Sequence, residues 1–235
     1  SNVLVRDKGI RGIVIKLGNM LRHFYEAEDL LVFGSGYSLA LASYKAMECG
    51  RTGMEFAVGI PGSIGGAVYM NAGAYDGEMQ NIVNCVKVMD LQGNERVLTA
   101  EELNFGYRKT SLQNSGLIVT EVTLKMPSGN KDEIKSKMDD FSHRRISKQP
   151  LEMPSAGSMF KRPPGYFAGT LIDQAGLKGY TVGGAQISTK HAGFVVNVGG
   201  ATAADVLQLI KDVQTKIKAG VGVELQPEVL VIGEE

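Results

Sequence analysis

The sequence contains few cysteines, no excess of charge of either sign and no long hydrophobic run. Its two cysteines, Cys49 and Cys85, are too few for a disulfide framework, and no CxxC spacing predicts a metal site. The 25 basic and 25 acidic side chains cancel, whereas a dedicated nucleic-acid-binding protein usually has a basic excess. Every apolar stretch ends well before the about 18 residues that a membrane span needs. We therefore expect a cytoplasmic protein with no metal, no nucleic-acid partner and no membrane partner.

Glycine, by contrast, is abundant, at 30 of 235 residues or about 13%, against an average of about 7%. The glycines cluster within 59–77 and 157–200 rather than in one linker. Glycine inside apolar sequence is typical of backbone that approaches a neighbour closely. The hydrophobic fraction of 43% excludes an intrinsically disordered chain, and the length allows one large domain or two small ones.

The order of predicted elements favours an α+β fold, because hairpins and helices are segregated rather than alternating as βαβ units. Strands are predicted over 12–17, 30–34, 117–126 and 228–232, with a hairpin over 80–98 around Gly93 and Asn94. Helices are predicted over 38–48, 130–148 and 202–220, and 99–102 fits a capping box that opens a short helix. Residues 127–129 are a plausible linker between two domains.

The segment Gly59-Ile60-Pro61-Gly62-Ser63-Ile64-Gly65-Gly66-Ala67 is a candidate phosphate-binding loop. Backbone N–H groups in such a loop can cradle a phosphate, and glycine permits the close approach. The segment has neither the GxxxxGK[ST] pattern of a P-loop nor the GxGxxG pattern of a Rossmann site. A tight structural turn explains it equally well.

Three further segments carry polar side chains suited to anion chemistry. Arg108, within 107–111, can hold an anion through its planar guanidinium or can be a surface charge. The segment 155–166 combines a hydroxyl, two cations and an aromatic ring, which suits proton donation and diphosphate binding or a basic surface loop. Glu228 precedes an apolar terminal strand and can act as an acid or face water.

Together these segments are far more specific than any one of them. They occur in one order with 176–179, 184–186, 191–192 and Asn197, and this order closely resembles the UDP-N-acetylenolpyruvoylglucosamine reductases. The similarity covers essentially the whole chain, and 162–166 resembles the shorter subtype without an inserted tyrosine loop. The resemblance implies a vanillyl-alcohol-oxidase-type FAD-binding domain over 1–127 and a C-terminal α+β substrate-binding domain over 128–235.

The resemblance also implies a reaction. NADPH reduces FAD, and UDP-N-acetylglucosamine enolpyruvate then takes a hydride at C3 and a proton at C2 to give UDP-N-acetylmuramate for peptidoglycan. By position in the family's motifs, Arg108 supplies a cation for the enolate, Glu228 assists through its carboxyl group, and Ser158 is the general acid. We expect the protein to act as a monomer.

The cofactor and substrate residues follow from the same resemblance. Those expected at FAD are Ser1, Asn2, Gly59, Ile60, Pro61, Gly62, Ser63, Gly65, Gly66, Ala67, Asn71 and Ile118. Those expected at the nucleotide-sugar are Tyr107, Lys161, Tyr166, Lys178 and Gln186.

The opening residues 1–7 match only the tail of the family's phosphate loop. The resemblance thus implies a flavin subdomain before this chain, so we expect the chain by itself to bind FAD weakly or not at all. Two alternatives remain open at this stage. One is another flavin oxidase of the same superfamily, and the other is a cofactor-free module that binds a nucleotide-sugar without turnover.

Overall fold

The computed structural model describes residues 2–235 and divides into two compact units. The first, which we call the split unit, comprises the residues up to Val14 together with Arg145–Glu235. The second, the continuous unit, comprises Ile15–Arg144. Among the described residues, no helix is long and apolar enough to cross a membrane.

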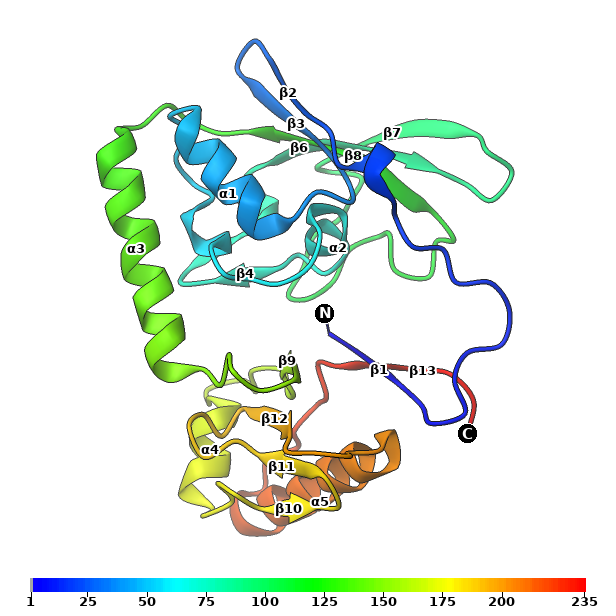
Figure 1. Ribbon diagram of the computed structural model, residues 1–235, viewed down its shortest axis with the longest axis vertical. Coiled ribbons are helices and arrows are strands. Elements are labelled where there is room, and N and C mark those ends of the chain that lie inside the picture. The colour runs from blue at the N-terminus through cyan, green and yellow to red at the C-terminus, as the bar shows by residue number, and fades with distance from the viewer. Residues whose placement is uncertain (1) are drawn as a thin grey trace. The chain divides into compact units, whose positions relative to one another are not determined.

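The continuous unit is built on a five-stranded antiparallel sheet. Its order is β2 (Phe24–Ala27), β3 (Leu30–Gly34), β8 (Ile118–Lys125), β6 (Val83–Met89) and β7 (Glu95–Thr99). The strands predicted over 30–34 and 117–126 and the hairpin over 80–98 are thus confirmed. Helices α1 (Leu39–Glu48) and α2 (Ile64–Tyr69) lie on one face of this sheet (Figure 1) and enclose the main hydrophobic core with it.

Short elements complete the continuous unit. They are the 3-10 helices η1 (Asn19–Leu21), η2 (Glu55–Ala57) and η3 (Met79–Asn81), and the antiparallel pair β4 (Gly73–Ala74) and β5 (Gly77–Glu78). The long helix α3 (Lys131–Lys148) begins in this unit, and the division from the split unit falls within it, after Arg144. Local capping explains why the predicted helices begin where they do. Ser38 Oγ accepts from Leu41 N at 3.4 Å, and Asn130 Oδ1 accepts from Asp132 N at 2.8 Å.

The split unit contains a four-stranded antiparallel sheet in the order β10 (Thr181–Val182), β11 (Ala185–Ile187), β12 (Phe194–Asn197) and β9 (Ser155–Ser158). Helices α4 (Ala168–Gln174) and α5 (Ala203–Val221) share its core. The helix predicted over 202–220 is confirmed, and its apolar side chains Leu209, Ile210, Val213 and Ile217 are all buried. Helix α5 begins with a capping box between Thr202 and Asp205.

Residues near the start of the chain are anchored to its last segment. Strand β1 (Val3–Val5) pairs in parallel with β13 (Leu230–Ile232). The Asp7 carboxylate then accepts from Ala203 N at 2.6 Å and from Ala204 N at 2.9 Å, so it caps α5 across the whole sequence. Residues 3–7 therefore belong structurally with the C-terminal part of the chain.

Four predictions of secondary structure are corrected. The 12–17 segment is not a strand, because no neighbouring strand among residues 2–235 offers it backbone partners, and Ile13 is 92% exposed. Residues 99–102 form both capping-box hydrogen bonds but no helix follows. The last strand begins at Leu230 rather than at 228. Helix α5 passes Gly220 and ends at the left-handed Gly222, with φ of 72°.

The 127–129 segment is held in place rather than being a free linker. Pro127 O accepts from Thr52 N at 3.0 Å, and Gly129 N donates to Gly50 O at 2.8 Å. The segment therefore lies inside the continuous unit, whose division from the split unit falls at Arg144 and Arg145. A functional boundary near Pro127 stays a prediction.

Candidate active site

Three segments far apart in the sequence form one backbone ladder in the split unit. Glu228 N donates to Met159 O at 2.8 Å, and Lys161 N donates to Gln226 O at the same distance. Two residues after Glu228, Leu230 N donates to Asn2 O at 2.8 Å, at the start of the β1–β13 pairing. The predicted acid Ser158, the predicted carboxylate Glu228 and the predicted phosphate-loop residue Asn2 are therefore close along neighbouring segments.

Buried neighbours hold these side chains in position. Met159 and Phe160 directly follow Ser158 and are 2% and 4% exposed, and Val229 directly follows Glu228 and is 5% exposed. Ser158 itself is exposed at the end of β9, and Glu228 is half-buried. The core thus anchors the backbone on both segments while the Ser158 hydroxyl stays accessible.

Arg108 lies in the continuous unit, in a tight turn where its φ is +55°. Its guanidinium donates to Asn71 O at 3.4 Å and to Gly73 O at 3.1 Å, and it lies 4.9 Å from the Tyr107 ring centre. Both acceptors are backbone carbonyls, so these two bonds orient the guanidinium. That arrangement suits a group that stabilises a developing anion.

The Asn71 side chain hydrogen-bonds to several segments near Arg108. Its side chain is fully buried and donates to Glu78 Oε2 and to Gly106 O, each at 3.0 Å, while its Oδ1 accepts from Gln80 N. Asn71 also adopts the left-handed region, with φ of +43°. The structure thus gives this side chain internal partners, and its predicted contact with the cofactor stays a prediction.

The glycine-rich loop joins η2 to α2 and lies against the end of β3. Leu39 N donates to Gly62 O and Ile64 N donates to Tyr37 O, so the loop pairs with the segment that leads into α1. Gly62 has φ of +117°, which favours glycine. Gly65 and Ala67 are buried, whereas the other predicted cofactor residues of the loop are exposed or half-buried: Gly59, Ile60, Pro61, Gly62, Ser63 and Gly66. Ile118 is half-buried at the start of β8, and Ser1 lies outside the described residues.

An open cavity of about 660 Å³ lies beside this loop. Its lining comes entirely from the continuous unit and consists of Lys16, Leu17, Arg22, Gly36, Tyr37, Ser38, Leu41, Gly62 and Ser63. A Cβ added at Gly36 would lie only 3.1 Å from Leu21 O, so a larger residue would crowd this wall of the cavity. The cavity has two cations and no acidic residue in its lining. Its size and charge therefore suit part of an anionic dinucleotide such as FAD.

The residues predicted at the nucleotide-sugar are distributed over both units. Tyr107 is exposed in the continuous unit, and the split unit holds Lys161, Tyr166, Lys178 and Gln186. Lys178 Nζ is paired with Asp173 at 2.7 Å, and Gln186 Nε2 donates to Thr181 Oγ1 at 3.0 Å. Sequence reasoning missed the cavity residues Lys16 and Arg22, because no motif contains them.

Comparison with known proteins decides the family. Residues 1–99 match the FAD binding domain model, and residues 149–232 match the model of the UDP-N-acetylenolpyruvoylglucosamine reductase C-terminal domain. The reductase of Clostridium perfringens is 52% identical over 235 residues, which cover 100% of this chain and 77% of that protein. The chain belongs to the UDP-N-acetylenolpyruvoylglucosamine reductase family. It is an FAD-dependent oxidoreductase of α+β fold, as the resemblance implied.

Other members of the reductase family agree. The Geobacillus thermodenitrificans reductase is 50% identical over 235 residues, covering 100% of this chain and 77% of that protein. The crystal structure of UDP-N-acetylenolpyruvylglucosamine reductase from Thermus caldophilus matches with a TM-score of 0.86 and 40% identity, covering 98% of this chain and 82% of that one. The resemblance is therefore confirmed over both units.

Proposed function

We propose that this protein reduces UDP-N-acetylglucosamine enolpyruvate to UDP-N-acetylmuramate, a peptidoglycan precursor, with NADPH as the reductant. The observation that carries the proposal is the bond from Glu228 N to Met159 O, which keeps Ser158 and Glu228 on neighbouring segments. An acid and a carboxylate held this closely suit a reaction that must both stabilise and protonate an enolate.

FAD, when bound, supplies the hydride to substrate C3. The resulting enolate is conjugated with a carboxylate, so negative charge accumulates on oxygen. Arg108 supplies a fixed positive charge for this anion, because its guanidinium is held by two backbone carbonyls. Tyr107, Lys161, Tyr166, Lys178 and Gln186 bind the nucleotide-sugar, and the predicted flavin residues include Asn2, Asn71 and Ile118.

Ser158 delivers the proton to C2. A serine hydroxyl is a weak acid, but the enolate is a strong base, and neighbouring charge stabilises the alkoxide that remains. Glu228 assists from the adjacent segment through its carboxyl group. Its side chain is half-buried, which places it at the border between the core and solvent.

The experiment separates the two halves of the reaction by stopped-flow absorbance of the flavin. Ser158→Ala is expected to leave flavin reduction by NADPH unchanged and to slow reoxidation by the enolpyruvyl substrate by about 10²–10⁴-fold. Ser155→Ala, in the same strand β9, is the matched control. Normal reoxidation by Ser158→Ala would remove this residue from the mechanism. Binding of the UDP-sugar without any flavin turnover in the unmodified protein would favour a binding module instead.

A further inference from the structure

The His191 ring is bonded to the strand pair that carries Ser158. In that pair β9 runs beside β12, and Ser158 is the register partner of Phe194. Gly193, the residue before Phe194, accepts from Met159 N through its carbonyl at 2.9 Å. The Nδ1 atom of His191 in turn accepts from Gly193 N at 3.0 Å. Gly193 therefore connects the ring to the residue that follows Ser158.

The same bonds continue to Glu228. Met159 O accepts from Glu228 N at 2.8 Å, so Met159 is held through its N–H by Gly193 and through its carbonyl by Glu228. We propose that His191 is a positioning residue, which holds Ser158 in place for proton transfer through the Gly193 carbonyl. This inference rests on the proposed function.

Packing against two glycines fixes the ring. A Cβ added at Gly169, in α4, would lie 3.2 Å from His191 Cε1, and a Cβ added at Gly193 would lie 3.0 Å from the same atom. A side chain at either position would therefore push against the ring. The Phe194 ring meets it edge-on, with the two ring centres 5.0 Å apart. These contacts keep Nδ1 of His191 directed at Gly193 N.

A buried hydroxyl holds the backbone of the same turn. Ser188 Oγ accepts from Lys190 N at 3.1 Å and from His191 N at 3.3 Å. Ser188 N donates to Phe194 O at 2.9 Å, which closes the turn between β11 and β12. The Lys190 side chain leaves the turn and donates to Ile146 O at 2.8 Å. Because these bonds do not involve the imidazole, a substitution of His191 tests the Nδ1 bond itself.

The bond to Gly193 N requires a neutral ring, because a protonated imidazole has a donor at both nitrogens. The charged groups around the ring are Asp173 in α4, Lys178 after α4 and Lys148 at the end of α3. Burial lowers the pKa of His191 and the two lysines lower it further, outweighing the ring's own backbone and the Asp173 carboxylate, which raise it. The ring therefore stays neutral to a lower pH than an ordinary histidine.

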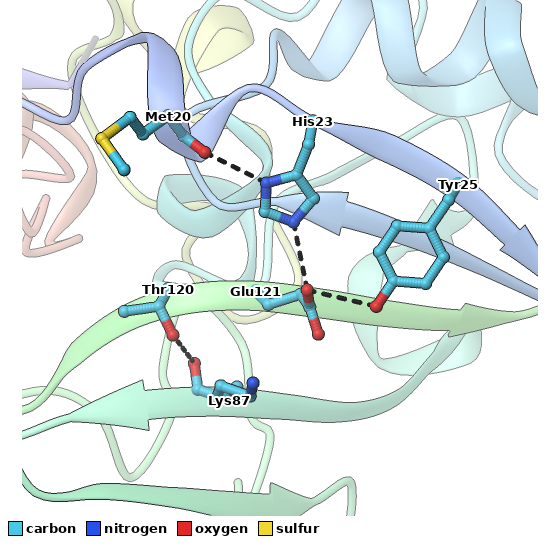
Figure 2. Close-up of polar contacts among 6 residues, drawn as sticks. All are labelled: Met20, His23, Tyr25, Lys87, Thr120 and Glu121. Atoms are coloured by element: carbon cyan, nitrogen blue, oxygen red, sulfur yellow. Dashed lines mark hydrogen bonds and ion pairs between the residues drawn. The ribbon is translucent and has the colours of Figure 1, made fainter.

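His23 provides the opposite case within the same chain. Figure 2 shows its ring in the continuous unit, where Nδ1 lies 3.1 Å from Met20 O and Nε2 lies 3.0 Å from Glu121 Oε2. Both partners are acceptors, so a protonated His23 ring keeps both bonds, whereas a protonated His191 ring loses the bond from Gly193 N. His23→Asn is therefore the matched control for effects of histidine protonation.

The first test measures amide hydrogen exchange of the full chain by NMR and needs no flavin. His191→Leu removes the Nδ1 acceptor, whereas His191→Asn keeps an acceptor, because an asparagine side chain can bond the backbone two residues on. His191→Leu is expected to speed exchange of the Met159 amide about tenfold, and His191→Asn to change it by less than about twofold. His23→Asn should leave it unchanged. Circular dichroism checks that each variant is folded.

The second test measures flavin reoxidation by the enolpyruvyl substrate in the flavin-loaded protein. His191→Leu is expected to slow it about 10–100-fold, with flavin reduction by NADPH and the substrate KM unchanged. His191→Asn should keep most of the rate. In the unmodified protein the rate should fall as the pH drops below the ordinary histidine value of 6.5 and the ring is protonated. This fall should be smaller in His191→Asn, which does not titrate, and unchanged in His23→Asn.

The outcomes separate this inference from the proposed function. Normal exchange at Met159 or normal reoxidation in His191→Leu would overturn the inference while the reductase activity stood. A His191→Asn variant as slow as His191→Leu would also overturn it, because the effect would not depend on an acceptor at this position. If His191→Leu does not fold, identical pH profiles of His191→Asn and the unmodified protein would overturn it. Exchange at Met159 that depends on His191, in a protein that reduces no enolpyruvyl substrate, would support the bonded path and contradict the proposed function.

Discussion

Glu228 N lies 2.8 Å from Met159 O, so the residue after the predicted acid is bonded directly to the predicted carboxylate residue. The neighbouring bridge between Phe160 and Pro227 extends the same antiparallel contact. These bonds fix the separation of the two segments without involving either side chain. Substitutions of Ser158 and Glu228 can therefore test chemistry with little effect on the backbone that carries them.

We expect the effects of Ser158→Ala and Glu228→Gln on substrate-driven flavin reoxidation to be non-additive. When two residues act together in one step, removing either one already removes most of their joint effect on the rate. The double variant should therefore react about as slowly as the slower single variant. Single-turnover rates of the three variants give the coupling directly. Ser158→Ala combined with Glu224→Gln, an exposed carboxylate that follows α5 and pairs with Lys218, is the control pair. Rates that simply multiply would mean that the two residues act independently.

Asn71→Ala is expected to lower the free energy of unfolding by about 2–4 kcal/mol, because it removes three hydrogen bonds made by a fully buried side chain. The groups that lose a partner are the Glu78 carboxylate, Gly106 O and Gln80 N. Urea denaturation followed by circular dichroism measures the change. Asn84→Ala, at an exposed asparagine, should shift it by no more than about 0.5 kcal/mol. Similar values for the two variants would contradict the role given to Asn71.

The lowered pKa of the buried Glu55 carboxyl predicts that stability depends on pH. Burial raises the pKa of this carboxyl, but hydrogen bonds from Thr52 Oγ1 at 2.6 Å and Gly53 N at 2.8 Å outweigh burial, and the pKa lies below the ordinary 4.5. A lowered pKa in the folded state stabilises the protein above the ordinary value, and this contribution is lost as the pH falls through the folded pKa.

The stability difference between the unmodified protein and Glu55→Gln should therefore be largest near neutral pH and shrink as the pH falls below the ordinary 4.5. Urea midpoints at pH 7 and pH 3.5 measure it. Glu101→Gln removes an exposed carboxylate and is the control. A difference that stays constant between the two pH values would show that the Glu55 charge contributes nothing.

Replacing either of two glycines at the end of α5 by alanine should change the stability of the protein, in opposite directions. Gly220 is helical and a Cβ added there would meet only open space, so Gly220→Ala should stabilise the protein by up to about 1 kcal/mol. Gly222 has φ of 72°, so Gly222→Ala should destabilise it by roughly 1 kcal/mol. Thermal unfolding of the two variants gives the comparison. A stabilising effect at Gly222 would contradict its role as the helix end.

The sequence predicts best those features of the fold that depend on contacts between residues close together in the chain. Ser38 and Thr202 bond to backbone a few residues away, so the starts of α1 and α5 follow from the sequence alone. The 12–17 segment has strand composition, but a strand also needs a neighbour, which composition does not provide. Two nearby glycines, Gly220 and Gly222, make the end of α5 ambiguous until φ is known.

The same limit applies to the candidate site, whose residues are brought together by contacts between distant parts of the chain. Ser158, Arg108 and Glu228 came from resemblance, and the backbone ladder that unites Ser158 with Glu228 joins residues almost 70 positions apart, beyond the reach of any local pattern. Lys16 and Arg22 lie in no recognisable motif. They line one cavity only because the turn at η1 pairs with β3 in the folded chain. The Asp7 cap on α5, which spans 196 positions, had no sequence signal at all.

The pairing of β1 with β13 has a consequence for biosynthesis. During translation the continuous unit is complete once Arg144 has left the ribosome, whereas β1 (Val3–Val5) gains its partner β13 only when that last strand is made. We therefore expect vectorial folding, in which the middle of the chain folds first and the split unit closes last. Closing so long a loop costs little more than closing a shorter one, since the entropy grows only with the logarithm of loop length, but the high contact order makes it slow.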